Sequence, residues 1–347
     1  TNPTLSQGEQ GYEIDTSKFK IGDGTTAWTS LSYFSGYTDA DVDTHLNTST
    51  ATSGEVLSWT GTDYDWITAG GGGGSPDLFA ENYDGTSTLP SATGTNAIAI
   101  GTNAVATNTY SFAGPMSRTT GGGSFSCNIN STSSSYGAQG VSSVAIGPSA
   151  KTTTNWSYAL GRNAASTAQY AVILGGYACE ASANYGYAFG HRGKAEFIGK
   201  YAFGVYTSNT VGGSQGGYMV LARNTTDATA GPLCSTGGTG TGSTDNQVIL
   251  PNNSAYTFSG TIVARQQAAT GTDVGAWEVK GIIRREANAG TTVLVNSVLN
   301  EINAPTGWAV ALTADTTNGG LKIEVTGVAS TNIRWVANIQ TAEVTYA

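Results

Sequence analysis

The chain has 347 residues, of which 11% are charged and 48 are glycine, and its formal net charge is −9. Ordinary soluble domains have about 25% charged residues, so this surface is unusually neutral. The 15 lysines and arginines form no stripe, which argues against nucleic acid or an anionic membrane as a partner. The length allows two or three domains.

Neither a signal peptide nor an apolar run of roughly 18 residues is found in the sequence, so no membrane insertion is expected. The three cysteines, Cys127, Cys179 and Cys234, are widely spaced and form no paired metal motif. We therefore expect free thiols and no metal or cofactor site built on them.

Residues 1–36 are expected to form a small antiparallel β module. Gly11–Asp15 and Lys18–Gly22 are short alternating runs around a Thr-Ser turn, and Gly22-Asp23-Gly24 is a turn cluster. The glycine cluster lacks the strand-loop-helix context and the following Lys-Ser/Thr of a phosphate-binding loop. The pattern therefore indicates a structural module and not a nucleotide site.

From Gly8 to Trp28 the chain reads GEQGYEIDTSKFKIGDGTTAW. This string resembles the N-terminal module shared by many phage tail-fibre and receptor-binding proteins. The resemblance covers about a tenth of the chain. It implies a virion protein, assembled in the host cytoplasm, whose N-terminal end attaches to a phage tail or baseplate protein.

Residues 37–69 are expected to form a connector that begins with a short helix. Thr38 can cap the helix, and Val42 and Leu46 lie on one face at i, i+4. Three alternating aspartates also suggest a calcium loop, but the central glycine and the distal glutamate of such a loop are missing. The acidic residues fit the positive end of the helix dipole better. They are Asp39, Asp41 and Asp43.

The connector is expected to end in a hairpin formed by Glu55–Trp59 and Tyr64–Ile67. A Gly-rich linker over residues 70–95 should follow, because five consecutive glycines occupy Gly70–Gly74.

Residues 96–210 contain a repeated apolar tag that ends in glycine. Its six copies are Ala97–Gly101, Ser143–Gly147, Ser157–Gly161, Ala171–Gly175, Gly186–Gly190 and Lys200–Gly204. From Gly147 onward the closing glycines are 14, 14, 15 and 14 residues apart. A fixed short period of this kind indicates a solenoid of stacked coils.

Within most tags, two large residues flank an alanine, which is the alternation of a strand with a bulky face and a small face. Each period therefore predicts two short strands and two turns, with the closing glycine at a turn that rejects a Cβ atom. These turn glycines are Gly101, Gly147, Gly161, Gly175, Gly190 and Gly204. So thin a coil encloses few side chains, and its bulky face needs a second surface, most simply that of an identical chain.

The tags resemble the head repeats of trimeric autotransporter adhesins, which also carry Ser-x-Ala-Ile-Gly at about this period. The resemblance implies a left-handed parallel β-roll assembled as a homotrimer, over roughly a third of the chain. The competing interpretation is disordered Gly/Ser/Ala low complexity. Disorder does not require large residues at one phase of a period.

Residues 115–140 interrupt the period and are interpreted as an insertion, either a spacer or a surface loop that carries binding. It contains Arg118, Phe125, Cys127 and Tyr136.

Residues 211–347 hold about seven longer alternating runs, which predict an antiparallel β-sandwich knob and complete an all-β fold. The knob tryptophans lie on the apolar phase and are expected in the core. Two Asn/Thr/Gly-rich loops are the candidate receptor contacts. The candidate residues are Arg223, Asn224 and Asn246 in the first loop, and Asn303 and Thr306 in the second.

Catalysis is not expected. The chain has only His45 and His191, and no serine elbow lies near either one. No carboxylate pair for glycoside cleavage can be derived from the spacing of the acidic residues. His191, Arg192 and Lys194 could form an anion-binding ring in three copies, although a solvated basic turn is the simpler interpretation.

Taken together, these features predict a trimeric phage tail fibre that attaches to a host surface glycan or protein through its C-terminal knob. The alternatives are a polysaccharide-degrading tail spike and a bacterial trimeric surface adhesin. The absence of secretion and anchor segments in the sequence disfavours the adhesin.

Overall fold

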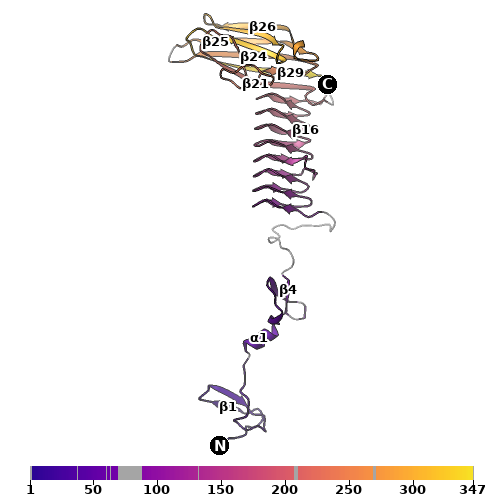
Figure 1. Cartoon of the computed structure of the whole chain (residues 1–347), viewed down its shortest axis with the longest axis vertical. Helices are drawn as coiled ribbons and strands as arrows, with labels where there is room; N and C mark the ends of the chain where they lie inside the picture. The colour runs from indigo at the N-terminus through magenta and orange to yellow at the C-terminus, as the bar shows by residue number, and fades with distance from the viewer. Residues whose placement is uncertain are drawn as a thin grey trace. The chain divides into compact units, whose positions relative to one another are not determined.

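The structure is a computed structural model that describes residues 2–36, 38–59, 61–62, 64–68, 88–131, 133–206, 210–268 and 271–346. The chain divides into two compact units, Thr1–Glu81 and Asn82–Ala347 (Figure 1). The predicted glycine joint at Gly70–Gly74 lies outside the described residues. Within the described ranges, no helix is long and apolar enough to cross a membrane.

The first unit begins with the predicted antiparallel module. Strands β1 (Gln10–Glu13) and β2 (Lys18–Ile21) pair with Tyr12 opposite Phe19. Lys20 is buried, and its Nζ donates to the Trp28 carbonyl at 2.8 Å. Asp23 accepts hydrogen bonds from Thr26 and Thr25, which hold the pKa of its carboxyl well below the usual range. These bonds fix the Gly-Asp-Gly turn.

The predicted connector helix and hairpin are both confirmed. Helix α1 (Asp39–His45) starts with a capping box in which Thr38 and Asp41 bond each other's backbone N–H. After a short 3-10 turn, η1 (Thr48–Thr50), the strands β3 (Glu55–Trp59) and β4 (Tyr64–Thr68) pair antiparallel.

The second unit begins with a parallel β-solenoid in which each coil contributes one strand to each of two ladders (Figure 1). The first ladder consists of β6 (Ile98–Ala99), β8 (Phe112–Ala113), β10 (Phe125–Cys127), β12 (Val144–Ile146), β14 (Tyr158–Arg162), β16 (Val172–Tyr177), β18 (Tyr187–Gly190) and β20 (Tyr201–Gly204). The second consists of β5 (Ser91–Ala92), β7 (Val105–Ala106), β9 (Arg118–Thr119), β11 (Gly137–Ala138), β13 (Lys151–Thr152), β15 (Ala165–Ser166), β17 (Glu180–Ala181) and β19 (Lys194–Ala195). The predicted β-roll of about 14 residues per coil is thereby confirmed.

Two predicted boundaries of the roll differ from the structure. Strand β5 pairs with β7, so the first coil starts inside the range 70–95 that was assigned to a linker. The range 115–140 is not an insertion, because it contains β9, β10 and β11 in both ladders. Strand β10 keeps the bulky phase at Phe125, and the extra residues form one longer connection between Cys127 and Gly137.

The alternation within the tags is confirmed by the burial of the side chains. The alanines at the centre of most tags are buried, whereas their bulky neighbours point outward. Ala145, Ala159, Ala188 and Ala202 are fully buried in one core cluster. The interior of the coils is filled mainly by small side chains, although Ile129 and Ile173 are also fully buried there, and most of the larger side chains lie on the surface.

Five of the six predicted turn glycines have a positive φ angle, and Gly204 does not. At Gly161, where φ is 130°, an added Cβ would lie 2.6 Å from the Gly176 carbonyl of the next coil. The turns also contain other left-handed residues. Those in one row of turns are Asn96, Tyr110, Ser142, Trp156, Tyr170 and Tyr185.

Five long antiparallel strands follow the roll in the spatial order β26, β25, β24, β29, β21. Their bounds are β21 (Ser214–Thr225), β24 (Ser254–Gln266), β25 (Val274–Arg285), β26 (Val293–Asn303) and β29 (Ile333–Thr345). Strand β21 also pairs with β20 of the last coil, so the knob sheet and the first ladder form one continuous sheet. The knob at 211–347 is therefore joined to the roll by strand pairing.

A smaller antiparallel sheet covers one face of the knob sheet. It contains β22 (Gly231–Pro232), β23 (Val248–Ile249), β27 (Ala309–Asp315) and β28 (Gly320–Thr326), and a 3-10 turn, η2 (Ala289–Thr291), precedes β26. Side chains of both sheets form the main core, in which Trp277 and Trp335 are buried with ring centroids 5.4 Å apart. The predicted core position of these tryptophans is correct.

Candidate functional site

The knob sheet has a second face that the small sheet does not cover, and we call it the open face. Alternation places every second residue of each strand on it, and register aligns these residues in rows. One row is Val298, Lys280, Ser259, Gln340 and Tyr218. The next row is Asn300, Glu278, Thr261, Asn338 and Val220. All ten side chains are exposed.

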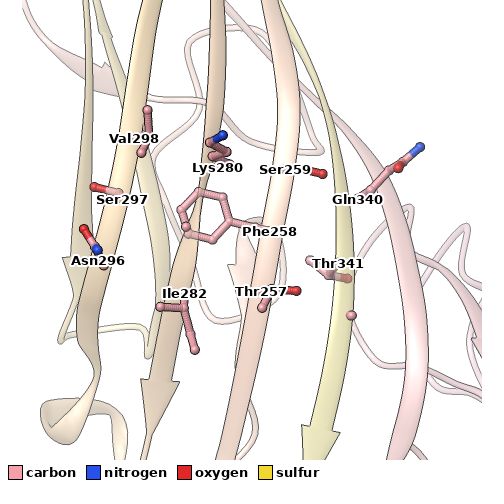
Figure 2. A pocket seen from close by; sticks show the side chains of 12 residues that line it. Thr257, Phe258, Ser259, Lys280, Ile282, Asn296, Ser297, Val298, Gln340 and Thr341 are labelled. Atoms are coloured by element: carbon pink, nitrogen blue, oxygen red, sulfur yellow. The ribbon is translucent and has the colours of Figure 1, made fainter.

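A hollow of about 690 Å³ lies on the open face and crosses strands β26, β25, β24 and β29. Figure 2 shows its side chains, among which Lys280, Ser259 and Gln340 come from three neighbouring strands. Its lining combines hydroxyl and amide side chains with the apolar side chains of Phe258, Ile282 and Val298.

A second hollow of about 630 Å³ shares Ser259, Lys280, Val298 and Gln340 with the first, so the two form one groove. In this part the Thr261 hydroxyl donates to Asn338 Oδ1 at 3.1 Å. The groove thus offers one cation at Lys280 and several groups that can donate and accept hydrogen bonds. This chemistry suits a hydroxyl-rich ligand.

Acidic side chains are few in the groove. Of the described residues that line it, Glu278 is the only carboxylate, whereas glycoside hydrolysis uses two carboxyl groups roughly 5 to 9.5 Å apart. Over the described ranges, no group of three or more His, Cys, Asp or Glu side chains could hold a metal ion. The cysteines are free thiols, as predicted, and burial raises the pKa of Cys179 and of Cys234.

The structure separates the five residues that sequence reasoning grouped as receptor contacts. Arg223 Nη1 donates to the carbonyls of Gly240 at 2.7 Å and Pro232 at 3.2 Å, so its charge anchors the loop. Asn246 is 6% exposed and bonds to Ser243 and Thr241, which makes it a loop-shaping residue.

The other three candidates lie at opposite edges of the knob sheet. Asn224 is on β21, and Asn303 ends β26, four strand spacings or about 19 Å away. Asn303 donates to the Val274 carbonyl, and Thr306 is exposed in the turn that follows. These residues therefore do not form one site.

The possible anion ring is built from residues that already have neighbours. The ring of His191 stacks on Tyr177 with centroids 5.1 Å apart, and Arg192 lies 5.9 Å from the same Tyr177 ring. Lys194 Nζ is 3.3 Å from Glu196 Oε2. The Glu196 carboxylate therefore already neutralises the Lys194 charge that would be needed to bind an anion.

Sequence reasoning missed a buried ion pair at the junction of the roll and the knob. Lys200 Nζ lies 2.7 Å from Glu343 Oε2, and both side chains are fully buried. Gln215 Nε2 donates to the same Glu343 oxygen at 2.7 Å. A signal was present, because Lys200 opens the last tag at a position where earlier tags have Ser, Ala or Gly.

Comparison with known proteins identifies the repeats. Residues 92–113 and 138–155 match two copies of the YadA head domain repeat. No curated protein matches the chain. The β-roll therefore contains YadA-like head repeats, as predicted.

Solved structures similar to this chain include three tailspike proteins. The tailspike gp49 of Acinetobacter baumannii bacteriophage Fri1, a capsular polysaccharide depolymerase, is 7% identical with a TM-score of 0.24, and the match covers 67% of this chain and 41% of gp49. The tailspike of Acinetobacter phage vB_ApiP_P1 is 10% identical with a TM-score of 0.21, and the match covers 72% of this chain and 54% of that tailspike. The tailspike of Acinetobacter baumannii phage AM24 is 9% identical with a TM-score of 0.19, and the match covers 71% of this chain and 47% of that tailspike. The chain spans about half the length of these tailspikes, and the TM-scores are too low to define a common fold.

Proposed function

We propose that the chain is a trimeric receptor-binding fibre of a phage tail, which attaches to the tail by its N-terminal module and to a host surface by its C-terminal knob. The motif from Gly8 to Trp28 supports the first attachment, and the open-face groove supports the second. YadA-like repeats support an adhesive role.

The outward face of the first ladder is the main support for the proposed trimer. It presents bulky side chains on almost every coil, and adjacent rings stack in pairs, such as Tyr187 on Tyr201 at 4.5 Å. Several of these side chains are about half exposed: Ile98, Tyr158, Leu174, Tyr201 and Phe203. Eight coils at about 4.8 Å make this apolar column nearly 40 Å long. A patch of this size on a repeating element fits the same patch on identical chains.

The knob is proposed to bind its receptor without cleaving it. A groove whose lining includes hydroxyl and amide groups supports weak hydrogen bonding to a glycan or a protein surface. Three linked copies raise the overall affinity by roughly 10² to 10⁴ through high effective concentration, so no deep pocket is required.

Binding of the full-length protein to host cells tests this function. We expect a Lys280→Ala/Gln340→Ala variant to lose at least tenfold in adsorption, because it removes two groove side chains from one row of the open face. The control is Lys322→Ala, a lysine of the small sheet that is paired with Glu324. Unchanged adsorption of the double variant would argue against the groove.

Two further results separate the alternatives. Release of reducing sugar ends from host polysaccharide by the purified protein would favour a depolymerising tail spike. Detection of the protein on bacterial cells and its absence from phage particles would favour a surface adhesin.

A further inference from the structure

A third hollow, of about 530 Å³, lies at the far end of the knob sheet and shares no residue with the groove. Its lining includes two arginines, one from each of two neighbouring strands, together with amide and hydroxyl side chains. The polar residues used below are Arg265, Arg334, Asn224, Gln267, Asn332 and Thr226.

The two arginines stand side by side without an acidic partner. Arg265 of β24 and Arg334 of β29 are direct register partners on the open face, and both are exposed. Across the described part of the chain, no carboxylate lies within 4.0 Å of either guanidinium. Arg334 Nε donates to Asn224 Oδ1 at 3.3 Å. Like charges directly opposite one another destabilise a sheet, so this arrangement favours a negatively charged ligand.

We propose that this hollow binds an oxyanion carried by a host surface glycan, either a uronic-acid carboxylate or a phosphodiester. The inference rests on the proposed receptor-binding function and names the class of receptor. Two guanidinium groups can each donate two parallel hydrogen bonds to such an anion. Asn224, Thr226, Gln267 and Asn332 supply neutral polar groups for adjacent sugar hydroxyls.

The arginine pair lies to one side of the surface that the trimer is proposed to cover. Gln340 is in register with Tyr218, which pairs with Tyr201 of the apolar column. Arg334 is six residues away from Gln340 along β29, which corresponds to about 20 Å. Contact between copies along the column therefore does not of itself occupy the hollow.

The test uses the full-length protein and three probes: a tetrasaccharide that contains glucuronate, a neutral tetrasaccharide, and inorganic phosphate. We expect the wild type to bind at least one anionic probe more tightly than the neutral one, and to bind it more weakly as salt concentration rises. Preference for glucuronate or for phosphate identifies the source of the anion.

The Arg265→Gln/Arg334→Gln variant is expected to lose at least tenfold in affinity for the preferred anion. Arg284→Gln is the matched control, because Arg284 lies on the same face but is already paired with Glu286. Equal affinity of the double variant and the wild type, or no binding of either anion by the wild type, would overturn the proposal.

Native mass measurement of the double variant adds a separate outcome. Loss of the trimer would show that the arginines contact another copy, which also overturns the proposal. If wild-type and double-variant proteins adsorb equally to host cells, this inference fails while the receptor-binding function stands. If the wild type does not adsorb, the proposed function fails. The probe measurements then still decide whether the hollow binds an anion.

Discussion

At the scale of single residues, the turns of the β-roll impose backbone conformations that most side chains disfavour. Aromatic residues nevertheless occupy one row of left-handed positions, where Trp156, Tyr170 and Tyr185 stack at centroid distances of 5.2 and 5.0 Å. Ring stacking contributes roughly 0.5–1.5 kcal/mol per pair, which offsets part of the backbone cost. Glycine is needed where the next coil comes too close for a Cβ atom.

Gly161 tests that requirement. We expect Gly161→Ala to lower the melting temperature of the roll, because the alanine would adopt a positive φ and its Cβ would press on the Gly176 carbonyl. Gly122→Ala is the matched control, since a Cβ there meets nothing closer than 3.6 Å and φ is not positive. Similar melting curves for the two variants, measured by circular dichroism, would refute this account of the glycine.

At the scale of elements, the junction between roll and knob depends on strand pairing and on one buried ion pair. Strand β21 continues the ladder of β20, and Lys200 of the last coil meets Glu343 of β29 beneath it. Tyr256 is also buried against this cluster, and burial raises the pKa of its hydroxyl well above the usual value. The cluster is therefore buried, and removal of the lysine leaves Glu343 without a cation.

Removal of the buried lysine should destabilise the junction strongly. We expect Lys200→Met to reduce the free energy of unfolding by about 3–5 kcal/mol, because Glu343 would remain buried without its counter-ion. Lys322→Met breaks the more exposed pair with Glu324 and should cost less than about 1 kcal/mol. Urea unfolding at equal protein concentration compares the two, and an equal loss in both variants would contradict the role of burial.

Local periodicity predicted most of these elements. It failed for features that depend on contacts between residues far apart in the sequence. The bulky-Ala-bulky tags predicted the coils because each coil repeats its neighbour's environment. Phe125 was assigned to an insertion because its connection to the next coil is five residues longer than usual, although its strand keeps the ladder register. Asn246 looked like a surface contact by residue type alone, whereas tertiary packing buries it.

The groove and the arginine pair could not be predicted from the sequence, because both depend on contacts between distant parts of the chain. Lys280, Ser259 and Gln340 are distant in sequence, and only the register of β25, β24 and β29 brings them together. Arg265 and Arg334 likewise meet across one strand pair. Alternation indicated which face each side chain would occupy, but not which strands would be neighbours.

At the scale of the whole molecule, a single chain leaves one long surface without a partner. The coil interior is filled mainly by alanines, and most of the large apolar side chains of the roll lie outside it. The proposed trimer covers this column, and it also brings together three grooves and three arginine pairs. Affinity for a surface glycan then rises through multivalency and not through a deep site.

The mass of the full-length protein in solution tests the trimer most directly. Native mass spectrometry should detect three chains of 35.4 kDa each, and a Tyr201→Glu/Phe203→Glu variant should shift the population toward single chains by placing charges on the apolar column. Lys151→Glu, a charge change on the other ladder, is the control and should leave the trimer intact. A wild-type protein that stays folded as a 35.4 kDa monomer at micromolar concentration would contradict the account.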